Sequence, residues 1–262
     1  MAGTIYDVAR ALQGGKLDQE QVESLNAILA AWEAYGDGDP RKLAYALATA
    51  NHECNLRPIV ENLTYTSAAR IAQVWPSRFT VESAKPFVKN AQKLANEVYG
   101  GRMGNDEKND GYTYRGRGFV QLTGYANYEK FNKLIGEFLS AHPDLAKRPE
   151  YAARILIVGL MKGMFTGKKL ADYINATKTD YISARATVNG DVKANGAKIA
   201  GYADRFEDAL TEPVIPKSIE ESFIPKPVPP LAEPAKPVIV PMPTPAPSLW
   251  DRLSSWLRAR FA

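Results

Sequence analysis

Apolar residues recur at helical spacing along most of the first 212 residues. The first clear run begins after Asp18, whose side chain can cap a helix together with Gln21 three residues later, and it ends at Gly36. Its apolar positions, three or four residues apart, are Val22, Leu25, Leu29 and Trp32. This spacing places one apolar face along a helix and therefore predicts an amphipathic helix packed against a core.

A second helix is predicted to begin at Asp39-Pro40, because aspartate is a common N-cap residue and proline fits the first helical position. It should run to about Cys54 and stop before Pro58, since the residue before a proline disfavours helical backbone. Strand signals are short, and the best of them lies at about residues 118–122. Further helical runs are predicted at about residues 81–99, 124–139, 149–164, 168–174 and 178–188. The pattern predicts a mainly α fold, a bilobal helical domain over residues 1–212.

The composition changes abruptly after residue 212. Twelve of the eighteen prolines lie in residues 213–247, and no glycine follows Gly201. Proline lacks the amide donor and fixes φ, so this stretch cannot form a helix or a central strand. We interpret residues 213–247 as a proline-rich linker of extended polyproline type, the alternative being a tail without a role.

The last fifteen residues, 248–262, regain a helical pattern after this linker. Ser248 with Asp251 resembles a capping box, and Arg252, Arg258 and Arg260 add positive charge. The apolar positions of one face are Leu249, Trp250, Leu253, Trp256, Leu257 and Phe261. A cationic amphipathic helix with two tryptophans is typical of a membrane-interface segment, and docking on the helical domain or on a partner subunit is the alternative.

Charge and composition narrow the classes of site. The net charge of +4 fits an anionic polymer as partner, although this is weak support, and we expect no nucleic-acid partner. One cysteine excludes an intramolecular disulfide, and two histidines with one cysteine make a poor zinc site, so we expect no metal and no cofactor. The N-terminus shows no signal peptide, and the longest apolar run, residues 155–161, is too short to span a bilayer. We therefore expect synthesis in a cytoplasm.

Two glutamates are the first candidates for chemistry. Glu53 lies near the end of an apolar predicted helix, where burial would raise the pKa of its carboxyl and suit a general acid. Glu61 follows eight residues later, and Pro58 between them breaks the helix, so the chain can turn and bring Glu61 back across a cleft. Inverting glycosidases need two carboxyls about 6.5–9.5 Å apart. On spacing alone, however, such a pair is more often a solvated surface pair.

A long loop is predicted in the glycine-rich start of the segment that spans residues 99–128. Its aromatic residues Tyr112, Tyr114, Tyr125 and Tyr128 could stack on sugar rings, or could simply pack in the core. Its neutral polar residues Gln121, Thr123 and Asn127 could bond hydroxyl and acetamido groups. A third segment, from Arg185 through Asn189-Gly190 to Asp191, is by itself only a turn after a helix.

Four elements together resemble the glycoside hydrolase family 19 (chitinase-like) enzymes, and most closely their phage and prophage endolysin branch. These elements are His52-Glu53, Glu61-Asn-Leu-x-Tyr65, the stretch Tyr114-Arg-Gly-Arg-Gly-Phe-Val-Gln-Leu-Thr-Gly-Tyr-Ala-Asn-Tyr128, and Val188-Asn-Gly190. The Arg-Gly-Arg-Gly-x-x-Gln-Leu-Thr-Gly portion is the most specific of them. The resemblance covers about residues 20–210. It implies a lysozyme-like bilobal helical domain with a deep substrate cleft.

The resemblance also implies roles for individual residues. Glu53 matches the general acid, Glu61 matches the base that activates water, and Thr123 stands where the family holds that water. Arg205 matches a basic residue that supports the site. The other positions implied to bind substrate are His52, Tyr114, Arg117, Gln121, Asn127, Tyr128 and Asn189.

The function implied is that of an endolysin, a muramidase that hydrolyses β-1,4 bonds of bacterial peptidoglycan by an inverting mechanism and lyses the host. The resemblance further implies a monomer that stays in the host cytoplasm until a holin releases it to the periplasm and wall. Three alternatives stay open: a chitinase with the same acid and base, a cysteine amidase using Cys54 with His142, and a non-catalytic wall-binding or virion module.

Overall fold

A computed structural model of the chain describes residues 3–136 and 138–211. The chain divides into two units, Met1–Val214 and Ile215–Ala262, and every described residue belongs to the first. The linker predicted at residues 213–247 and the helix predicted at residues 248–262 therefore lie outside the described residues.

The first unit is mainly helical, which confirms the fold class predicted from the hydrophobic pattern. The two strands pair antiparallel, with Ile59 opposite Gly118 and Val60 opposite Arg117. The elements are α1 (Ile5–Leu12), α2 (Gln19–Tyr35), α3 (Pro40–Cys54), β1 (Ile59–Val60), α4 (Ala68–Val74), α5 (Val81–Ala84), α6 (Ala91–Tyr99), α7 (Asp110–Thr113), β2 (Arg117–Gly118), α8 (Tyr125–Ile135), α9 (Pro149–Lys162), α10 (Tyr181–Ala184) and α11 (Val192–Thr211), with 3₁₀-helices η1 (Lys85–Phe87), η2 (Pro143–Lys147), η3 (Leu170–Asp172) and η4 (Arg185–Thr187). Within residues 3–211, none of these helices combines the length and the apolar character needed to traverse a bilayer.

The predicted starts of α2 and α3 are confirmed in atomic detail. The Asp18 carboxylate accepts a hydrogen bond from the Gln21 amide at 2.9 Å, and the Gln21 side chain accepts one from the Asp18 amide at 3.1 Å. The Asp39 carboxylate caps α3 by accepting from the Arg41 amide at 3.0 Å. Helix α3 ends at Cys54 as predicted, and Asn55 adopts the left-handed conformation that closes a helix C-terminus.

Several predictions about helices were wrong or incomplete: α1 and α4 were not predicted, and the run predicted at residues 168–174 contains only the 3₁₀-helix η3. The run predicted at residues 81–99 is interrupted, because Pro86 lies in η1 between α5 and α6 and cannot donate an intrahelical bond. The twenty-residue helix α11 was not predicted either. A Cβ on Gly196 would lie 2.6 Å from the carbonyl oxygen of Ile182, so glycine permits the close approach of α11 to α10.

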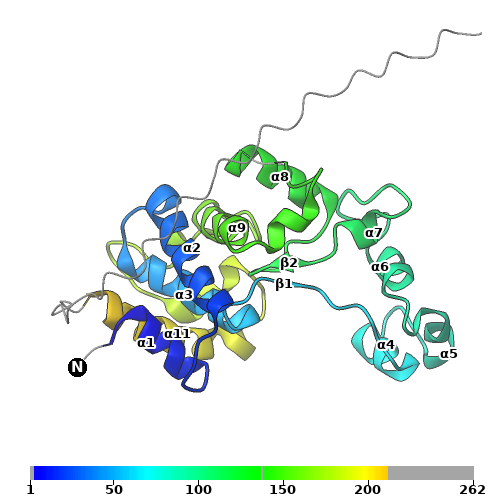
Figure 1. Cartoon of the computed structure of the whole chain (residues 1–262), viewed down its shortest axis with the longest axis horizontal. Coiled ribbons are helices and arrows are strands. Elements are labelled where there is room, and N and C mark those ends of the chain that lie inside the picture. Colours follow the sequence, from blue (N-terminus) through cyan, green and yellow to red (C-terminus); the bar gives the residue numbers. More distant parts are fainter. Residues whose placement is uncertain (1–2, 137, 212–262) are drawn as a thin grey trace, which may run out of the picture. The chain divides into compact units, whose positions relative to one another are not determined.

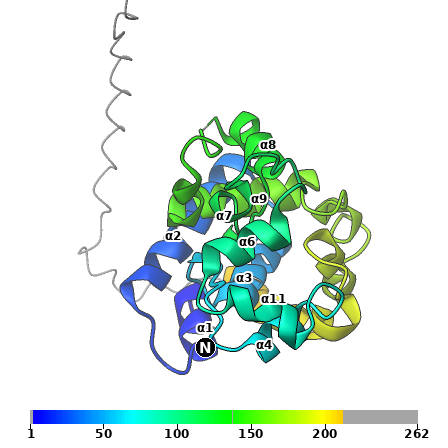
Figure 2. The same ribbon diagram turned by 90° about the vertical axis from the view of Figure 1, so that its right-hand side faces the viewer.

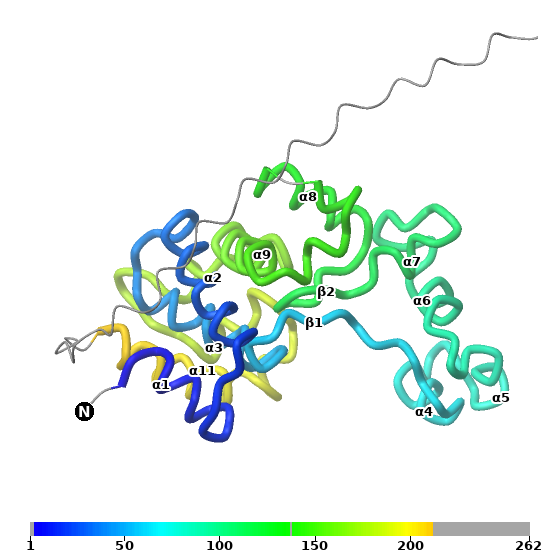
Figure 3. Tube along the Cα trace, viewed as in Figure 1, coloured from blue at the N-terminus to red at the C-terminus, as the bar shows by residue number. Residues whose placement is uncertain are grey.

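Three hydrophobic clusters form the interior of this unit. The first joins α1, α2, α3, α9 and α11, and the second lies between α8, α9 and η2. The third lies under α4, α5 and α6, around Leu63, Ile71, Phe87 and Leu94. Figure 1 shows α4, α5 and α6 grouped together beyond the two strands, and the turned view of Figure 2 shows α4 and α6 toward the viewer. Figure 3 shows that the chain leaves α3 along β1 to reach α4, and returns through α6 and α7 to β2.

This path fixes where the two candidate carboxylates lie in the fold. Glu53 is on the last turn of α3, in the part built on the first cluster. Glu61 directly follows β1, where the chain passes toward the third cluster. The helix and the strand that carry them are separated by a turn in which Asn55 and Leu56 both have positive φ. The change of direction that Pro58 suggested therefore begins three residues earlier.

Candidate active site

Glu53 is held by an arginine that is distant in the sequence. The guanidinium of Arg185, on η4, forms an ion pair with Glu53 Oε1 across 132 residues. The Arg185 side chain is 3% exposed, whereas the Glu53 side chain is 22% exposed. The Glu53 carboxylate is therefore partly accessible to solvent, although the cation it pairs with is buried.

A second carboxylate shares the same arginine. Asp191 accepts from Arg185 Nε at 2.5 Å and from Nη2 at 3.1 Å, and Asn195 Nδ2 donates to it at 2.6 Å. The hydrogen bonds from Arg185 lower the pKa of Asp191 to about 2. Asp191 is therefore ionised at neutral pH and balances the buried charge of Arg185 by itself. Arg185 therefore contacts two carboxylates, those of Glu53 and Asp191.

Glu61 is fixed by hydrogen bonds on both carboxylate oxygens. The hydroxyl of Tyr99 donates to Oε1 at 2.7 Å, and the amide of Gly116 donates to Oε2 at 3.2 Å. The Glu61 amide in turn donates to the Gly116 carbonyl at 2.9 Å, which extends the pairing of β1 and β2 by one residue. The two donors hold the Glu61 carboxylate beside the β1–β2 pair.

Gly116 also brings two predicted residues next to Glu61. A Cβ at Gly116 would lie 2.8 Å from Gln121 Oε1 and 3.3 Å from Thr123 Oγ1, so these side chains pack directly on the glycine backbone. Thr123 Oγ1 donates to the Gln121 carbonyl at 2.8 Å, and Asn127 Nδ2 donates to the Thr123 carbonyl at 2.7 Å. The structure thus groups Gln121 and Thr123 around Gly116, which is hydrogen-bonded to Glu61, and Asn127 is joined to them through Thr123.

Gln121 itself has an unusual backbone. Its φ of 52° places it in the left-handed region, which a side chain other than glycine enters at a cost. Its Nε2 donates to the carbonyls of Gly118 at 3.1 Å and Ile59 at 3.3 Å, so the side chain crosses from β2 to β1. Strain held in place by such contacts is common at functional sites.

Three of the predicted substrate-binding residues lie inside the protein. Arg117 is 3% exposed; it donates to the Thr113 carbonyl at 2.7 Å and to the Tyr128 hydroxyl at 3.0 Å, and it pairs with Asp144 at 3.0 Å. Tyr128 is fully buried, and Tyr114 is buried with its hydroxyl donating to the Ser140 carbonyl. In this structure they hold the segment in place, and their contact with substrate stays a prediction.

The remaining predicted residues are less closely connected to the two glutamates. His52 precedes Glu53; its Nδ1 is buried without a hydrogen-bond partner among the described residues, and burial lowers its pKa. The backbone amide of Asn189 donates to the Arg185 carbonyl at 3.0 Å, and the Asn189 side chain is exposed. Arg205 is exposed on α11, and its side chain forms no hydrogen bond or ion pair with another described residue. Its supporting role stays a prediction.

Three residues of the site were not predicted: Arg185, Asp191 and Tyr99. Arg185 carried a weak signal, because it is a charged residue on a short helix whose neighbours Ala184 and Val188 are apolar, and a buried charge needs partners. Asp191 was noted only as the end of a turn. Tyr99 ends a helix before Gly100, and nothing in the sequence relates it to Glu61.

Cys54 lies in an environment that does not suit a nucleophile. Burial raises the pKa of its thiol to about 12, and Sγ donates to the Ala50 carbonyl within α3. A catalytic cysteine needs a thiolate near neutral pH, so the structure argues against the cysteine amidase alternative. Across residues 3–136 and 138–211, no three His, Cys, Asp or Glu side chains are grouped as a metal would require.

Comparison with known proteins gives one informative similarity. The chain is 38% identical over 114 residues to a glycosyl hydrolase family 19 domain-containing protein of Haemophilus influenzae. The matched part is 42% of this chain and 56% of the relative, so the chain spans about half the length of the curated relative it matches. No family model matches the chain. The similarity supports a glycoside hydrolase at the level of family 19.

Proposed function

We propose that this chain is a lysozyme-like glycoside hydrolase that cuts the β-1,4 bonds of bacterial peptidoglycan by a single displacement with inversion. The observation that carries the proposal is the contrast between its two glutamates. Glu53 shares a buried arginine with Asp191, which is ionised at neutral pH, whereas Glu61 receives donors on both oxygens. Two carboxylates in different environments suit the different roles of acid and base that glycoside hydrolysis requires.

In the proposed mechanism, Glu53 donates its proton to the glycosidic oxygen as the bond to the anomeric carbon breaks. Arg185 keeps Asp191 as its ionised partner while Glu53 is protonated, and it stabilises the Glu53 carboxylate that forms when the proton leaves. The leaving sugar gains a hydroxyl, and the anomeric carbon develops the positive charge that the incoming water neutralises.

On the opposite face of the sugar, Glu61 takes a proton from the attacking water. Thr123 supports this role by its position against Gly116, whose amide bonds Glu61. The hydroxyl donates to the Gln121 carbonyl, so its lone pairs remain available to orient a water molecule. Attack from the face opposite the leaving group inverts the anomeric configuration, so a β-linked substrate gives an α-anomer first.

Purified peptidoglycan sacculi provide the direct test. Glu53→Gln and Glu61→Gln should each lower the release of new reducing ends by at least ~10²-fold, by the usual magnitude of general acid–base catalysis. Glu82→Gln is a matched control, because that carboxylate is 81% exposed and pairs only with Lys85 on the surface. A near-normal rate for Glu53→Gln would contradict the assignment of the acid.

The products distinguish this function from its alternatives. Mass spectrometry of released fragments should show reducing N-acetylmuramic acid ends, and proton NMR should show the α-anomer before mutarotation. Hydrolysis of chitin oligomers with no action on sacculi would instead identify a chitinase. Binding to sacculi without new reducing ends would identify a non-catalytic wall-binding module.

The biological role that we propose is that of a phage-type endolysin that lyses its bacterial host. In this proposal the enzyme acts as a monomer, remains in the host cytoplasm until a holin opens the inner membrane, and then reaches the wall. Residues 248–262 would contact a membrane through their apolar and cationic faces. Deleting them should preserve hydrolysis of isolated sacculi and reduce lysis of intact cells, and equal lysis by both forms would argue against membrane contact.

A further inference from the structure

Two groups donate hydrogen bonds to the Glu61 carboxylate, the hydroxyl of Tyr99 and the amide of Gly116. The bond from Tyr99 is the shorter, at 2.7 Å against 3.2 Å. Tyr99 is the last residue of α6, so it reaches Glu61 from the group of helices built on the third hydrophobic cluster. We propose that Tyr99 is a positioning residue that fixes the Glu61 carboxylate for attack on the glycosidic bond. This inference rests on the proposed function, in which Glu61 is the base.

Tyr99 is itself held firmly enough to position another group. The side chain of Asn105, which is 1% exposed, donates through Nδ2 to the Tyr99 carbonyl at 3.0 Å. Its Oδ1 accepts from the amide of Tyr125 at 2.8 Å, and its carbonyl accepts from the amide of Gly101. One buried side chain thus ties the end of α6 to the start of α8, and the phenol of Tyr99 projects from a fixed backbone.

The hydrogen bond restricts a side chain that would otherwise be free to rotate. A glutamate has three rotatable side-chain bonds, and the Gly116 amide alone bonds only one oxygen, at 3.2 Å. Adding the bond from Tyr99 fixes both oxygens and therefore the plane of the carboxylate. Burial raises the pKa of the Tyr99 phenol, so it remains a neutral donor at neutral pH.

The arrangement leaves Glu61 able to act as a base. Each carboxylate oxygen has about two acceptor sites, so one lone pair on each remains after the bonds to Tyr99 and Gly116. In the step itself, the water oxygen bonds to the anomeric carbon, its proton passes to such a lone pair, and the bond to the leaving oxygen breaks as Glu53 protonates it. Tyr99 keeps its own proton throughout. Its effect is on the geometry of the attack, since a displaced base lowers the rate without weakening substrate binding.

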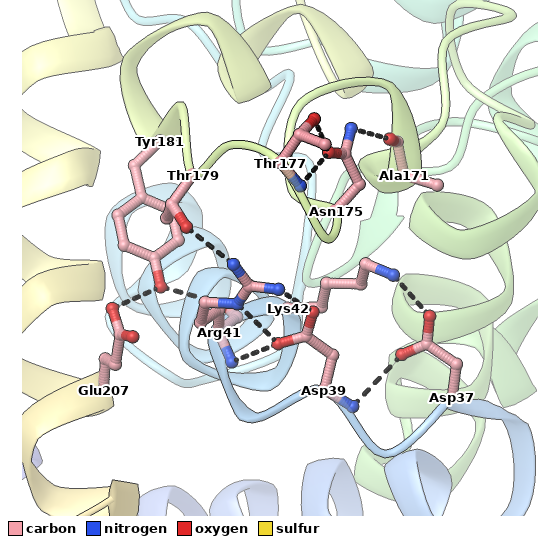
Figure 4. A network of polar contacts seen from close by, with 10 residues as sticks. All are labelled: Asp37, Asp39, Arg41, Lys42, Ala171, Asn175, Thr177, Thr179, Tyr181 and Glu207. Carbon is pink, nitrogen blue, oxygen red and sulfur yellow. Dashed lines mark hydrogen bonds and ion pairs between the residues drawn. The ribbon is translucent and has the colours of Figure 1, made fainter.

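Tyr99→Phe isolates this effect, because the ring still packs on the third cluster and only the hydroxyl is lost. We expect kcat on sacculi or soluble glycan strands to fall about 10-fold with KM unchanged. Tyr181→Phe is the matched control. Figure 4 shows that Tyr181 donates to the Glu207 carboxylate, at 2.8 Å, so its replacement removes the same kind of bond outside the proposed site. Its kcat should stay within about twofold of the wild-type value.

A double-mutant cycle separates positioning from a general structural effect. In the Glu61→Gln background, where no carboxylate remains to be positioned, Tyr99→Phe should lower the single-turnover rate by less than twofold. A similar loss in both backgrounds would overturn the proposal, as would an unchanged kcat for Tyr99→Phe. If Glu53→Gln and Glu61→Gln both kept the wild-type rate, the proposed function itself would fail. If the two glutamate variants lose activity as expected but Tyr99→Phe keeps the wild-type kcat, only the positioning role of Tyr99 is refuted.

Discussion

Asp191→Asn removes the second carboxylate from the buried arginine and leaves the shape of the side chain nearly unchanged. Arg185 is 3% exposed and bonds Asp191 through two of its nitrogens, so the substitution leaves Glu53 as its only ionised partner. We expect a loss of stability that depends on pH. We also expect a loss of activity, because protonation of Glu53 would then leave a buried cation without a charged partner.

The size of the stability change follows from the pKa of Asp191. Arg185 lowers that pKa from 3.8 to about 2, and each pH unit of difference between the folded and unfolded states is worth about 1.4 kcal/mol, so the ionised form stabilises the fold by at most about 2.5 kcal/mol. The Asp191 side chain is 30% exposed, so screening by solvent reduces this to about 1–2 kcal/mol. A pKa that is lower in the folded state gives stability that is complete above the unfolded value and is lost as the pH falls through about 2.

Urea unfolding of the wild type and of Asp191→Asn, measured from pH 7 down to pH 2, tests the reasoning. The difference in the free energy of unfolding should be about 1–2 kcal/mol above pH 5 and should shrink between about pH 4 and pH 2. Asp208→Asn, which replaces an exposed aspartate of α11, is the control. It should change neither the free energy of unfolding nor its dependence on pH. A difference that is constant across this range would refute the assigned charge pairing. A wild-type kcat for Asp191→Asn at neutral pH would refute its importance for Glu53.

Other parts of the structure give predictions that are simpler to test. Asn105→Ala leaves the Tyr99 carbonyl and the first amide of α8 without buried partners, so thermal or urea unfolding should show a loss of about 2–4 kcal/mol, and a loss below 1 kcal/mol would contradict this. Gly159→Ala would place a Cβ 1.9 Å from the ring of Phe165, and we expect at least about 3 kcal/mol of destabilisation or failure to fold; a wild-type melting temperature would show that the ring moves freely. Cys54→Ser should retain wild-type hydrolysis, and the native thiol should resist iodoacetamide until the protein unfolds, because burial raises its pKa to about 12. Rapid labelling at pH 8 would contradict that environment.

Local signals were sufficient for much of the fold. The two ends of α3 follow from Asp39-Pro40 and from the need to stop before Pro58, and the capping pair at the start of α2 is visible in the sequence. The failures involve positions where tertiary contacts override local preference. In α11, glycines weaken the helix locally, yet Gly196 allows the close packing against α10 that stabilises it. The hydrophobic pattern of α11 alone cannot show this contact, because it depends on a second helix.

The same distinction holds for the site. The sequence motifs indicate some of its residues, whereas others are brought to it only by the fold. Glu53 and the cluster around Gly116 lie in segments that the motifs marked, because each is formed by residues close together in the chain. The partner of each carboxylate comes from elsewhere: Arg185 lies 132 residues from Glu53, and Tyr99 lies 38 residues from Glu61.

The orientation of Glu61 shows why those partners matter. A motif specifies that a carboxylate is present at this point, and the left-handed turn at Asn55-Leu56 and the strand pairing determine where its backbone goes. Neither determines which way the carboxylate faces, because that depends on donors supplied by Gly116 and by a helix of the third cluster. Glu53, the proposed acid, lies in the part built on the first cluster, and Glu61, the proposed base, is held in part from the third. The separation of the two carboxyls therefore depends on how these clusters are joined. Substitutions at that junction should therefore change kcat more than KM even where they touch neither glutamate.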